Sequence, residues 1–570
     1  MNPVRQPLLL AVDLHQPIRW AALATLMLAA GSAAVATPPA LAAAEQRYAD
    51  WLDSNYALTT VTAGPANLLD GHDRAAWLQI LESRRRALDA ALDRVKPLKL
   101  GRTDERARAT MLRALAEPPS APAATSPDDA AQRCAAASQI DLGRSELSQA
   151  LYACFEHFGN HVAFEGRTIA RTTVLELLHQ LDSAEQRRAL FDAMQPLWTR
   201  INGSGEASSP YRRLIRAAVA EARARGRSPI SDAAHTVGAT PEDVESWLVT
   251  ILEHWRAANP GAPLEPWDYW SRYTSDTHPL DARVPPESIT PFCQRFFRDL
   301  GVDLEALGVM HDLEVRPGKA PLAYADFVSI GRATAAGWRP ARSRVSANVE
   351  RGGLFTLNEI VHEDGHAVHI SSIRTRPAFV GWGDDLFVEA FADVPSWSVL
   401  EPSWQRRYLG TGLDEQTALR ALYANVMLDV AWGLFELRMF RDPDADPNAV
   451  WTAITSTYLN IRPHPELAWW ALRVQLVDLP GYMINYGLGA VLTADLRARI
   501  RAAIGDFDAG NPKWYRYTAR NLLRFGVSVD TPELLRRFLG RPVSSAALVT
   551  QLDRMHRTNP QPAASSALPR

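Results

Sequence analysis

One short segment of the chain carries the residue types of a metal centre. His362 and His366 lie four positions apart, and Glu363 follows the first of them, which gives the pattern H-E-x-x-H. On a helix, side chains four residues apart share a face, so both imidazoles can bind one metal ion. Glu363 could then act as a general base on a metal-bound water. The alternative, two histidines in ordinary hydrogen bonds, is disfavoured because the preceding apolar residues predict a buried helix.

A catalytic zinc site needs a third protein ligand and an open position for water. The segment 385–397 offers Glu389, and Asp393 follows four residues later among apolar neighbours. We expect Glu389 to bind the metal. We expect Asp393 to support the site by accepting the free N–H of a ligand histidine. A solvated acidic face is the alternative, which the surrounding phenylalanine and aliphatic residues disfavour. The intervening residues 367–388 are long enough to turn between two helices.

A further histidine, His369, lies three residues after His366 and could point toward the same region. The longer pattern H-E-x-x-H-x-x-G-x-x-H of another peptidase group fails here, since position 369 is His and position 372 is Ser. Three ligands already suffice for zinc. We therefore interpret His369 as a packing or supporting residue.

The elements that position these residues are expected to be mostly helices. Helical spacing of apolar residues occurs at 84–95, 173–181, 184–201, 211–225 and 241–255. Short strand patterns precede the motif, at 313–316, 324–330 and 344–349. The sequence therefore predicts a mostly α fold with one small β-sheet near the metal site.

Composition excludes several classes of protein. The 570 residues are 47% hydrophobic and 22% charged, as in ordinary globular proteins and unlike disordered or fibrous ones. A net charge of -3 provides no global field that would attract nucleic acid or an anionic membrane. No Gly-x-Gly-x-x-Gly or phosphate-loop pattern opens a helix, which disfavours nucleotide chemistry.

The amino terminus has the features of an export signal. Arginines precede an apolar run that starts at Trp20, and Ala40-Leu41-Ala42 forms a small-residue cleavage pattern, so we predict a signal peptide over 1–42. An uncleaved anchor helix is the alternative, but the alanine-rich run is marginal for a stable membrane span. The mature protein is therefore expected to be periplasmic or secreted.

The remaining chain is divided by composition. We predict an N-terminal helical segment over 43–116 and a linker or mobile loop over 117–131, which is rich in proline, alanine and serine. A helical body is expected over 132–556, followed by a disordered tail over 557–570.

Three cysteines, Cys134, Cys154 and Cys293, allow at most one disulfide. An oxidising location would permit it, and Cys134 and Cys154 are the nearer pair. Three buried thiols are an equal alternative.

The motifs together resemble those of a known group. H-E-x-G-H followed by E-x-x-x-D is similar to the glutamate-ligand zinc peptidases (gluzincins), and closest to the angiotensin-converting-enzyme and thimet-oligopeptidase families. The resemblance covers residues 344–400. It implies a large two-lobed helical body with a deep central channel and Zn²⁺ at its floor. Short unfolded peptides would be the substrates, cleaved in the manner of an oligopeptidase or a peptidyl-dipeptidase.

This sequence also departs from those families. They place a histidine and tyrosines on a later helix to stabilise the oxyanion, whereas here Tyr482 and Tyr486 lie four apart with no histidine just upstream. Tyr486 is our candidate oxyanion donor and Tyr482 a less favoured one, while a core aromatic role is the alternative for both. The missing histidine keeps open a second function, a non-catalytic peptide-binding scaffold that retains zinc. An aminopeptidase is disfavoured because no Gly-x-Met-Glu-Asn segment is present.

Overall fold

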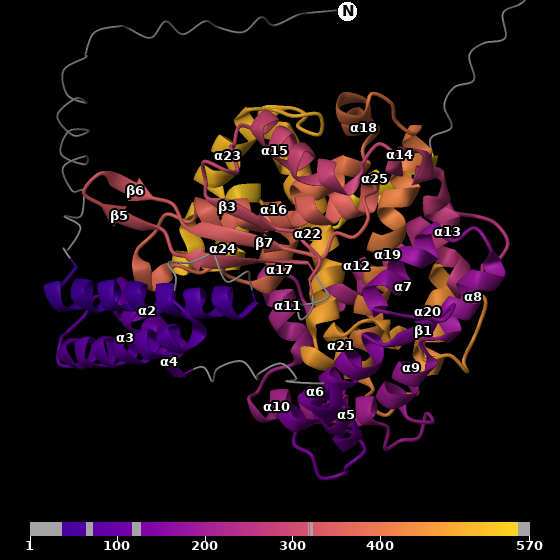
Figure 1. Ribbon diagram of the computed structural model, residues 1–570, viewed down its shortest axis with the longest axis horizontal. Helices are drawn as coiled ribbons and strands as arrows, with labels where there is room; N and C mark the ends of the chain where they lie inside the picture. The colour runs from indigo at the N-terminus through magenta and orange to yellow at the C-terminus, as the bar shows by residue number, and fades with distance from the viewer. Residues whose placement is uncertain (1–36, 64–71, 117–126, 317–318, 320–322, 557–570) are drawn as a thin grey trace, which may run out of the picture.

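The computed structural model describes residues 37–63, 72–116, 127–316, 319 and 323–556 (Figure 1). The first 36 residues of the predicted signal peptide and the predicted tail 557–570 lie outside these ranges. The predicted cleavage position after Ala42 falls inside the first described helix, where Leu41 is fully buried. The predicted domain boundaries remain predictions.

Helices dominate the described chain and confirm the mostly α class. The helices of the amino-terminal half are α2 (Pro39–Ala63), α3 (Arg74–Val95), α4 (Arg102–Ala116), α5 (Pro127–Ala136), α6 (Arg144–Cys154), α7 (Arg171–Gln180), α8 (Ala184–Asp192), α9 (Gln195–Asn202), α10 (Pro210–Ala224), α11 (Pro229–Val237), α12 (Pro241–Ala258), α13 (Tyr269–Thr274), α14 (His278–Asp281) and α15 (Ile289–Asp299). Those of the carboxyl-terminal half are α16 (Leu354–Ser372), α17 (Asp385–Ser396), α18 (Pro402–Leu409), α19 (Glu415–Arg441), α20 (Pro447–Tyr458), α21 (Gln475–Asp478), α22 (Tyr482–Ile504), α23 (Lys513–Asn521), α24 (Thr531–Leu539) and α25 (Ala546–Asp553).

Local sequence explains where several helices begin and end. Thr240 caps α12 by accepting from the Asp243 N–H at 3.1 Å, and Asp243 accepts from the Thr240 N–H at 2.9 Å. This reciprocal pair satisfies two free donors of the first turn. The single helix predicted over 184–201 is wrong, because the chain breaks between α8 and α9. Pro196 lies in the first turn of α9 and cannot continue a preceding helix.

The strands are few and short in the described chain: β1 (Val162–Phe164), β2 (Arg167–Ile169), β3 (Val309–Asp312), β4 (Tyr324–Ser329), β5 (Arg332–Thr334), β6 (Gly337–Arg339) and β7 (Arg342–Ser346). β7 is the central strand of a three-stranded sheet, parallel to β3 and antiparallel to β4. This sheet packs against α16, which confirms one small sheet near the motif helix.

The strand predicted at 313–316 is wrong, since β3 ends at Asp312. Asp312 accepts hydrogen bonds from Arg316 at 2.5 Å and from Lys319 at 3.2 Å. The buried Lys319 ammonium also donates to the carbonyl of Ala347 at 2.6 Å. These bonds hold Arg316 and Lys319 at the end of β3, and residues 313–316 are not in a strand.

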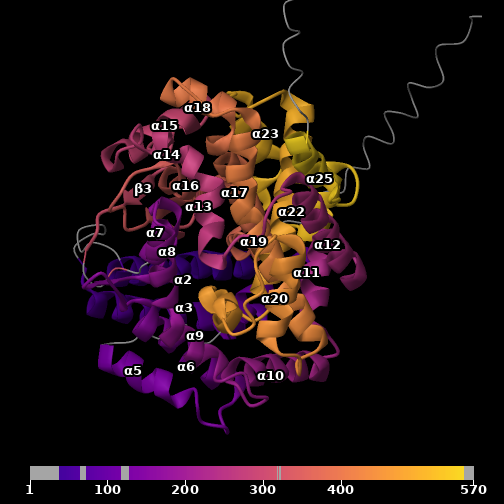
Figure 2. The same cartoon turned by 90° about the vertical axis from the view of Figure 1, so that its right-hand side faces the viewer.

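The core has two parts. A large cluster runs through the helical body, and a smaller one joins α2, α3 and α4 to residues of β4 and the turn 377–380. The three N-terminal helices lie together at one side of the molecule, while α16, α17 and α22 lie side by side near its centre (Figures 1 and 2). The two-lobed shape and the deep channel remain predictions.

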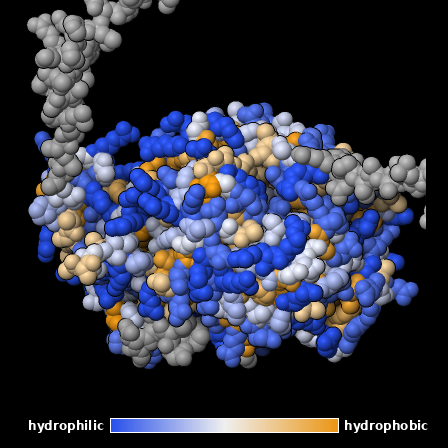
Figure 3. All heavy atoms as spheres, turned by 90° about the horizontal axis from the view of Figure 1, so that it is seen from above, coloured by the Kyte–Doolittle hydropathy of each residue, from blue (hydrophilic) through white to orange (hydrophobic). Residues whose placement is uncertain are grey.

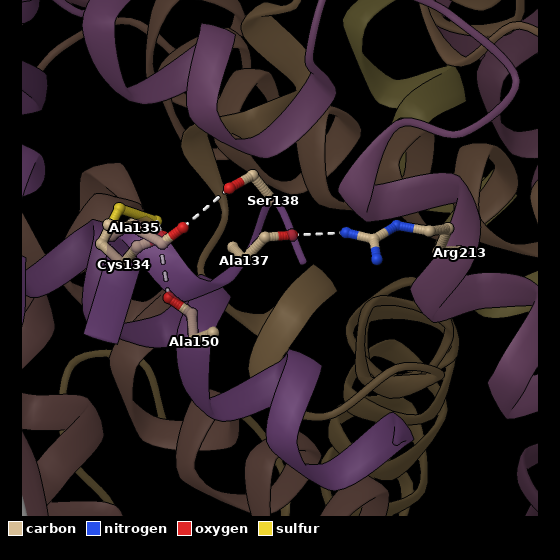
Figure 4. Close-up of a disulfide and its surroundings, with 7 residues drawn as sticks. Cys134, Ala135, Ala137, Ser138, Ala150 and Arg213 are labelled. Atoms are coloured by element: carbon tan, nitrogen blue, oxygen red, sulfur yellow. Dashed lines mark hydrogen bonds between the residues drawn. A yellow bond between two sulfur atoms is a disulfide. The ribbon is translucent and has the colours of Figure 1, made fainter. Parts of the chain in front are cut away.

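Cys134 and Cys154 form a disulfide that ties α5 to α6 (Figure 4). This decides between the two interpretations of the cysteines. The end of α5 is held further by Arg213 of α10, which donates to the carbonyl of Ala137. Cys293 is free and buried.

The face seen from above is mostly hydrophilic, with hydrophobic side chains scattered over it (Figure 3). Among the described residues, no helix has both the length and the apolar character needed to cross a bilayer.

Candidate metal centre

Helix α16 carries the H-E-x-x-H motif, and a glycine inside the motif sets its distance from α17. A Cβ atom at Gly365 would lie 2.9 Å from both the Cα and the carbonyl oxygen of Ala392 on α17. Only a residue without a side chain allows this approach. The two helices therefore touch at Gly365, and Glu389, one turn before Ala392, comes to face the two histidines.

The structure brings the three predicted ligands together. The Nε2 atom of His362 lies 3.5 Å from one carboxylate oxygen of Glu389, and the Nε2 atom of His366 lies 3.9 Å from the other. One ligand atom from each residue falls within 4.8 Å of the others. The nitrogen–oxygen separations of 3.5 and 3.9 Å fit ligands of a single ion with bonds of about 2.0–2.2 Å.

Asp393 lies where a supporting residue is needed. Its Oδ1 accepts from Nδ1 of His362 at 2.7 Å, and the Ser396 hydroxyl donates to the same oxygen at 3.2 Å. With Nδ1 bonded to Asp393, Nε2 is the ring nitrogen of His362 that faces Glu389 and can be given to a metal ion. This bond fixes the tautomer and the direction of the imidazole before any ion arrives.

Glu363 is nearly enclosed, with 5% of its surface exposed. Its Oε2 atom has no hydrogen-bond partner in the described part of the chain. Burial raises the pKa of Glu363 well above its usual range. A carboxyl group that is unpartnered and has a raised pKa is well suited to accept a proton and release it again.

His366 and His369 have aromatic surroundings. The His366 ring meets the edge of Trp382 with centroids 5.2 Å apart, and Trp382 is a contact that the sequence did not reveal. His369 packs between Phe387 and Phe391 of α17. Burial lowers the pKa of His369 to about 3, so it remains neutral. It lies outside the ligand group, in agreement with a packing role.

The two tyrosines of α22 have different surroundings. The Tyr482 hydroxyl donates to Oε1 of Glu389 at 3.3 Å. Tyr486 packs against the Tyr482 ring with centroids 5.4 Å apart, and within the described residues no group accepts from its hydroxyl. Burial, with Glu389 next in effect, raises the pKa of Tyr486 well above its usual value, so the phenol keeps its proton. Tyr482, the less favoured candidate for the oxyanion donor, is therefore the tyrosine that is hydrogen-bonded to the predicted ligand Glu389.

Charged residues that the sequence did not single out also line this region. Glu359 is exposed and precedes His362 and Glu363 by three and four residues, so it shares their face of α16. Asp429 of α19 is paired with Arg473, and burial raises the pKa of Asp429 to about 6. The i, i+3, i+4 spacing could have pointed to Glu359, whereas nothing local links Asp429 to the motif.

Two imidazole nitrogens and one carboxylate oxygen form a donor set that suits zinc. The ligand carboxylate also holds a hydrogen bond from Tyr482, and one ligand histidine is oriented by Asp393. The residues present therefore fit a zinc ion with a free coordination position.

Comparison with known proteins gives the fold. No family model matches the sequence, and no curated protein matches it. Among solved structures, the chain is similar to the M32 carboxypeptidase from Deinococcus radiodurans R1, with a TM-score of 0.50 and 16% identity over 90% of this chain and 98% of that one. It is similar to the Trypanosoma cruzi metallocarboxypeptidase 1 with the same TM-score and identity, over 91% and 99% of the two chains. The chain thus shares their largely helical architecture over 90–91% of its length.

Proposed function

We propose that the chain is an exported, zinc-dependent metallopeptidase that hydrolyses short peptides. The observation that carries this proposal is the convergence of His362, His366 and Glu389 beside an unpartnered, buried Glu363. A structural zinc site would have no use for such a base. The disulfide between Cys134 and Cys154 supports export, because disulfides persist in oxidising compartments.

Each residue of the centre has a distinct part in the proposed reaction. A bound zinc ion would lower the pKa of a water molecule and polarise the scissile carbonyl. Glu363 takes the proton from the attacking water and delivers it to the leaving amine. Asp393 keeps the His362 ring in place throughout. Tyr486, whose hydroxyl is protonated and has no acceptor in the described protein, donates a hydrogen bond to the developing oxyanion.

The bond that is cleaved can be proposed from the fold neighbours. Both are carboxypeptidases by name, so release of a single C-terminal residue is the first activity to test, ahead of dipeptide release and internal cleavage. Arg473 lies near the centre, but its guanidinium is paired with Asp429. A substrate carboxylate would have to compete with Asp429 for it.

A defined peptide mixture, incubated with the full chain and analysed by mass spectrometry, tests the proposal. Loss of cleavage with a chelator and its recovery with Zn²⁺ would support a zinc peptidase, and the product masses give the cleavage type. The matched control is E363Q, which should bind zinc without cleaving. Zinc bound by the parent chain without any cleavage would favour the alternative, a peptide-binding scaffold.

A further inference from the structure

The start of α22 is held by a carboxyl group that belongs to another helix. Glu436 of α19 has no exposed surface. Its Oε1 accepts from the N–H of Gly481 at 2.7 Å, and its Oε2 accepts from the N–H of Ile484 at 3.2 Å. The first N–H groups of a helix have no acceptor within that helix. Glu436 therefore caps the start of α22, a role that is usually filled by the side chain of the residue just before the helix.

The sequence of α22 supplies no capping side chain of its own. The residue before its first turn is Gly481, with φ 108° and no oxygen-bearing side chain. Helices α12 and α19 are capped locally, by Thr240 and Asp414, whereas α16 also begins at a glycine and takes a carboxylate from elsewhere, Asp281. The positive end of the α22 dipole also favours a carboxylate at this place.

Burying this carboxyl group is costly. Within the described residues no cation pairs with Glu436. Burial raises its pKa to about 8, although the N–H groups of Gly481, Ile484 and Met483 oppose the shift. A side-chain cap at position 481 is disfavoured, because the backbone there has φ 108°, which residues other than glycine rarely adopt. The N–H groups of the first turn therefore take their acceptor from α19.

The first turn of α22 also reaches the metal centre. Tyr482, the first residue of α22, donates its hydroxyl to the metal ligand Glu389 at 3.3 Å. On the α19 side, a Cβ at Gly433 would lie 2.9 Å from the carbonyl oxygen of Met483, so the helices are in direct backbone contact. The first turn of α22 is thus clamped between α19 and the metal centre.

We propose that Glu436 is a positioning residue for the metal centre, which fixes the first turn of α22 so that the Tyr482 hydroxyl stays on Glu389. Glu389 is thereby oriented toward the two histidines. The inference rests on the metal site of the proposed function, and it does not require that peptides are hydrolysed.

A double-mutant cycle on zinc affinity tests this. The dissociation constant for Zn²⁺ is measured by competition with a chromophoric chelator in the parent chain, E436A, Y482F and the double variant. Outer residues around a metal typically change its affinity by about 10- to 100-fold, so we expect each single variant to weaken binding by about 10-fold. In the Y482F background, E436A should have little further effect. E436Q, whose amide oxygen still accepts one N–H, should fall between the parent and E436A.

The matched control is D495A. Asp495 is also a fully buried carboxylate of α22, but it accepts from Arg541 and from the N–H of Ser544, far along the helix from Tyr482. This variant should lower the melting temperature and leave the zinc dissociation constant unchanged.

Two results would overturn the inference. One is a folded E436A that binds zinc as the parent does. The other is an equal loss of affinity in the presence and absence of the Tyr482 hydroxyl, which would indicate a purely structural role. If E436A does not fold, the same cycle with E436Q decides. A parent chain that binds no zinc would overturn the metal site as well, whereas zinc binding without peptide cleavage would overturn the proposed hydrolysis and leave this inference intact.

Discussion

The imidazole of His362 is held from α17 by Asp393, whose Oδ1 lies 2.7 Å from Nδ1 of the ring. The carboxylate and the ligand Glu389 are four residues apart on one helix. A single helix therefore supplies both a proposed ligand and the group that orients another proposed ligand. Any displacement of α17 would disturb both contacts together.

The first prediction concerns this contact. D393A should weaken zinc binding by about 10- to 100-fold, because the His362 ring loses the bond that fixes its tautomer and direction. Equilibrium dialysis followed by metal analysis measures the change. E185Q, which alters an exposed acid in the first turn of α8, is the control and should leave affinity unchanged. Equal affinity in D393A and the parent chain would contradict the assigned role.

The second prediction concerns the general base. E363Q should retain zinc and lower kcat by about 10²- to 10⁴-fold, since an amide cannot accept the proton of the attacking water. E359Q removes a carboxylate on the same face of α16 one turn earlier and should keep most of the turnover. Turnover at the parental rate in E363Q would show that another group is the base.

The third prediction separates the two tyrosines. Y486F should lower kcat by about 10²- to 10³-fold with zinc affinity unchanged, as expected for the loss of an oxyanion donor. Y482F should weaken zinc binding, because its hydroxyl donates to Glu389. Parallel measurements of kcat and of the zinc dissociation constant distinguish them. The reverse pattern would assign the oxyanion to Tyr482.

The fourth prediction follows from a buried ion pair behind the motif helix. Nε2 of His311 in β3 lies 2.8 Å from Oδ1 of Asp364. Burial lowers the pKa of His311, but the charge and hydrogen bond of Asp364 outweigh it, and the net pKa is raised. The pair therefore contributes stability fully below the unfolded pKa of about 6.5 and loses it as pH rises through the raised folded value.

H311Q should accordingly reduce the free energy of unfolding more at pH 6 than at pH 9. Urea denaturation of the metal-free chain at both pH values measures the two differences between parent and variant. If H311Q lowers the free energy of unfolding by the same amount at both pH values, protonation of His311 does not contribute to stability.

The fifth prediction concerns the disulfide. Cys134 and Cys154 are 20 residues apart in sequence, and a closed loop of this length is worth about 3 kcal/mol through its effect on the unfolded chain. Replacing both with serine should lower the melting temperature in a calorimetric scan. A reducing agent should shift the parent toward the variant and leave the variant unchanged. A reducing agent that also shifts the variant would point to another cause.

The motif helix and its partner were predictable because their information is local. The four-residue spacing of His362 and His366 needs only the period of a helix to place two nitrogens together. The sequence also predicted that a second helix brings Glu389 and Asp393 back to the histidines, from the apolar residues around them and from the length of the segment between the two helices. The glycine that permits this return, Gly365, belongs to the motif, but the atoms of Ala392 that require it became visible only in the packed structure.

Two predictions of secondary structure were wrong. The helix expected over 184–201 has continuous apolar periodicity, yet Pro196 divides it. Residues 313–316 are not in a strand, and at the end of β3 Asp312 binds the side chains of Arg316 and Lys319 instead. In neither place did the apolar pattern reveal where the element ends.

By itself, the sequence determined the helical class, the three candidate ligands, the candidate base and the acid that supports a ligand. Tertiary structure alone decided which tyrosine reaches Glu389, that Cys134 and Cys154 are joined, and that Glu436 holds the start of α22. The physical reason is the distance along the chain between the residues that interact. Spacing along a helix dictates which side chains share its face, whereas contacts between α17, α19 and α22 depend on how whole helices pack, and no short stretch of sequence specifies that.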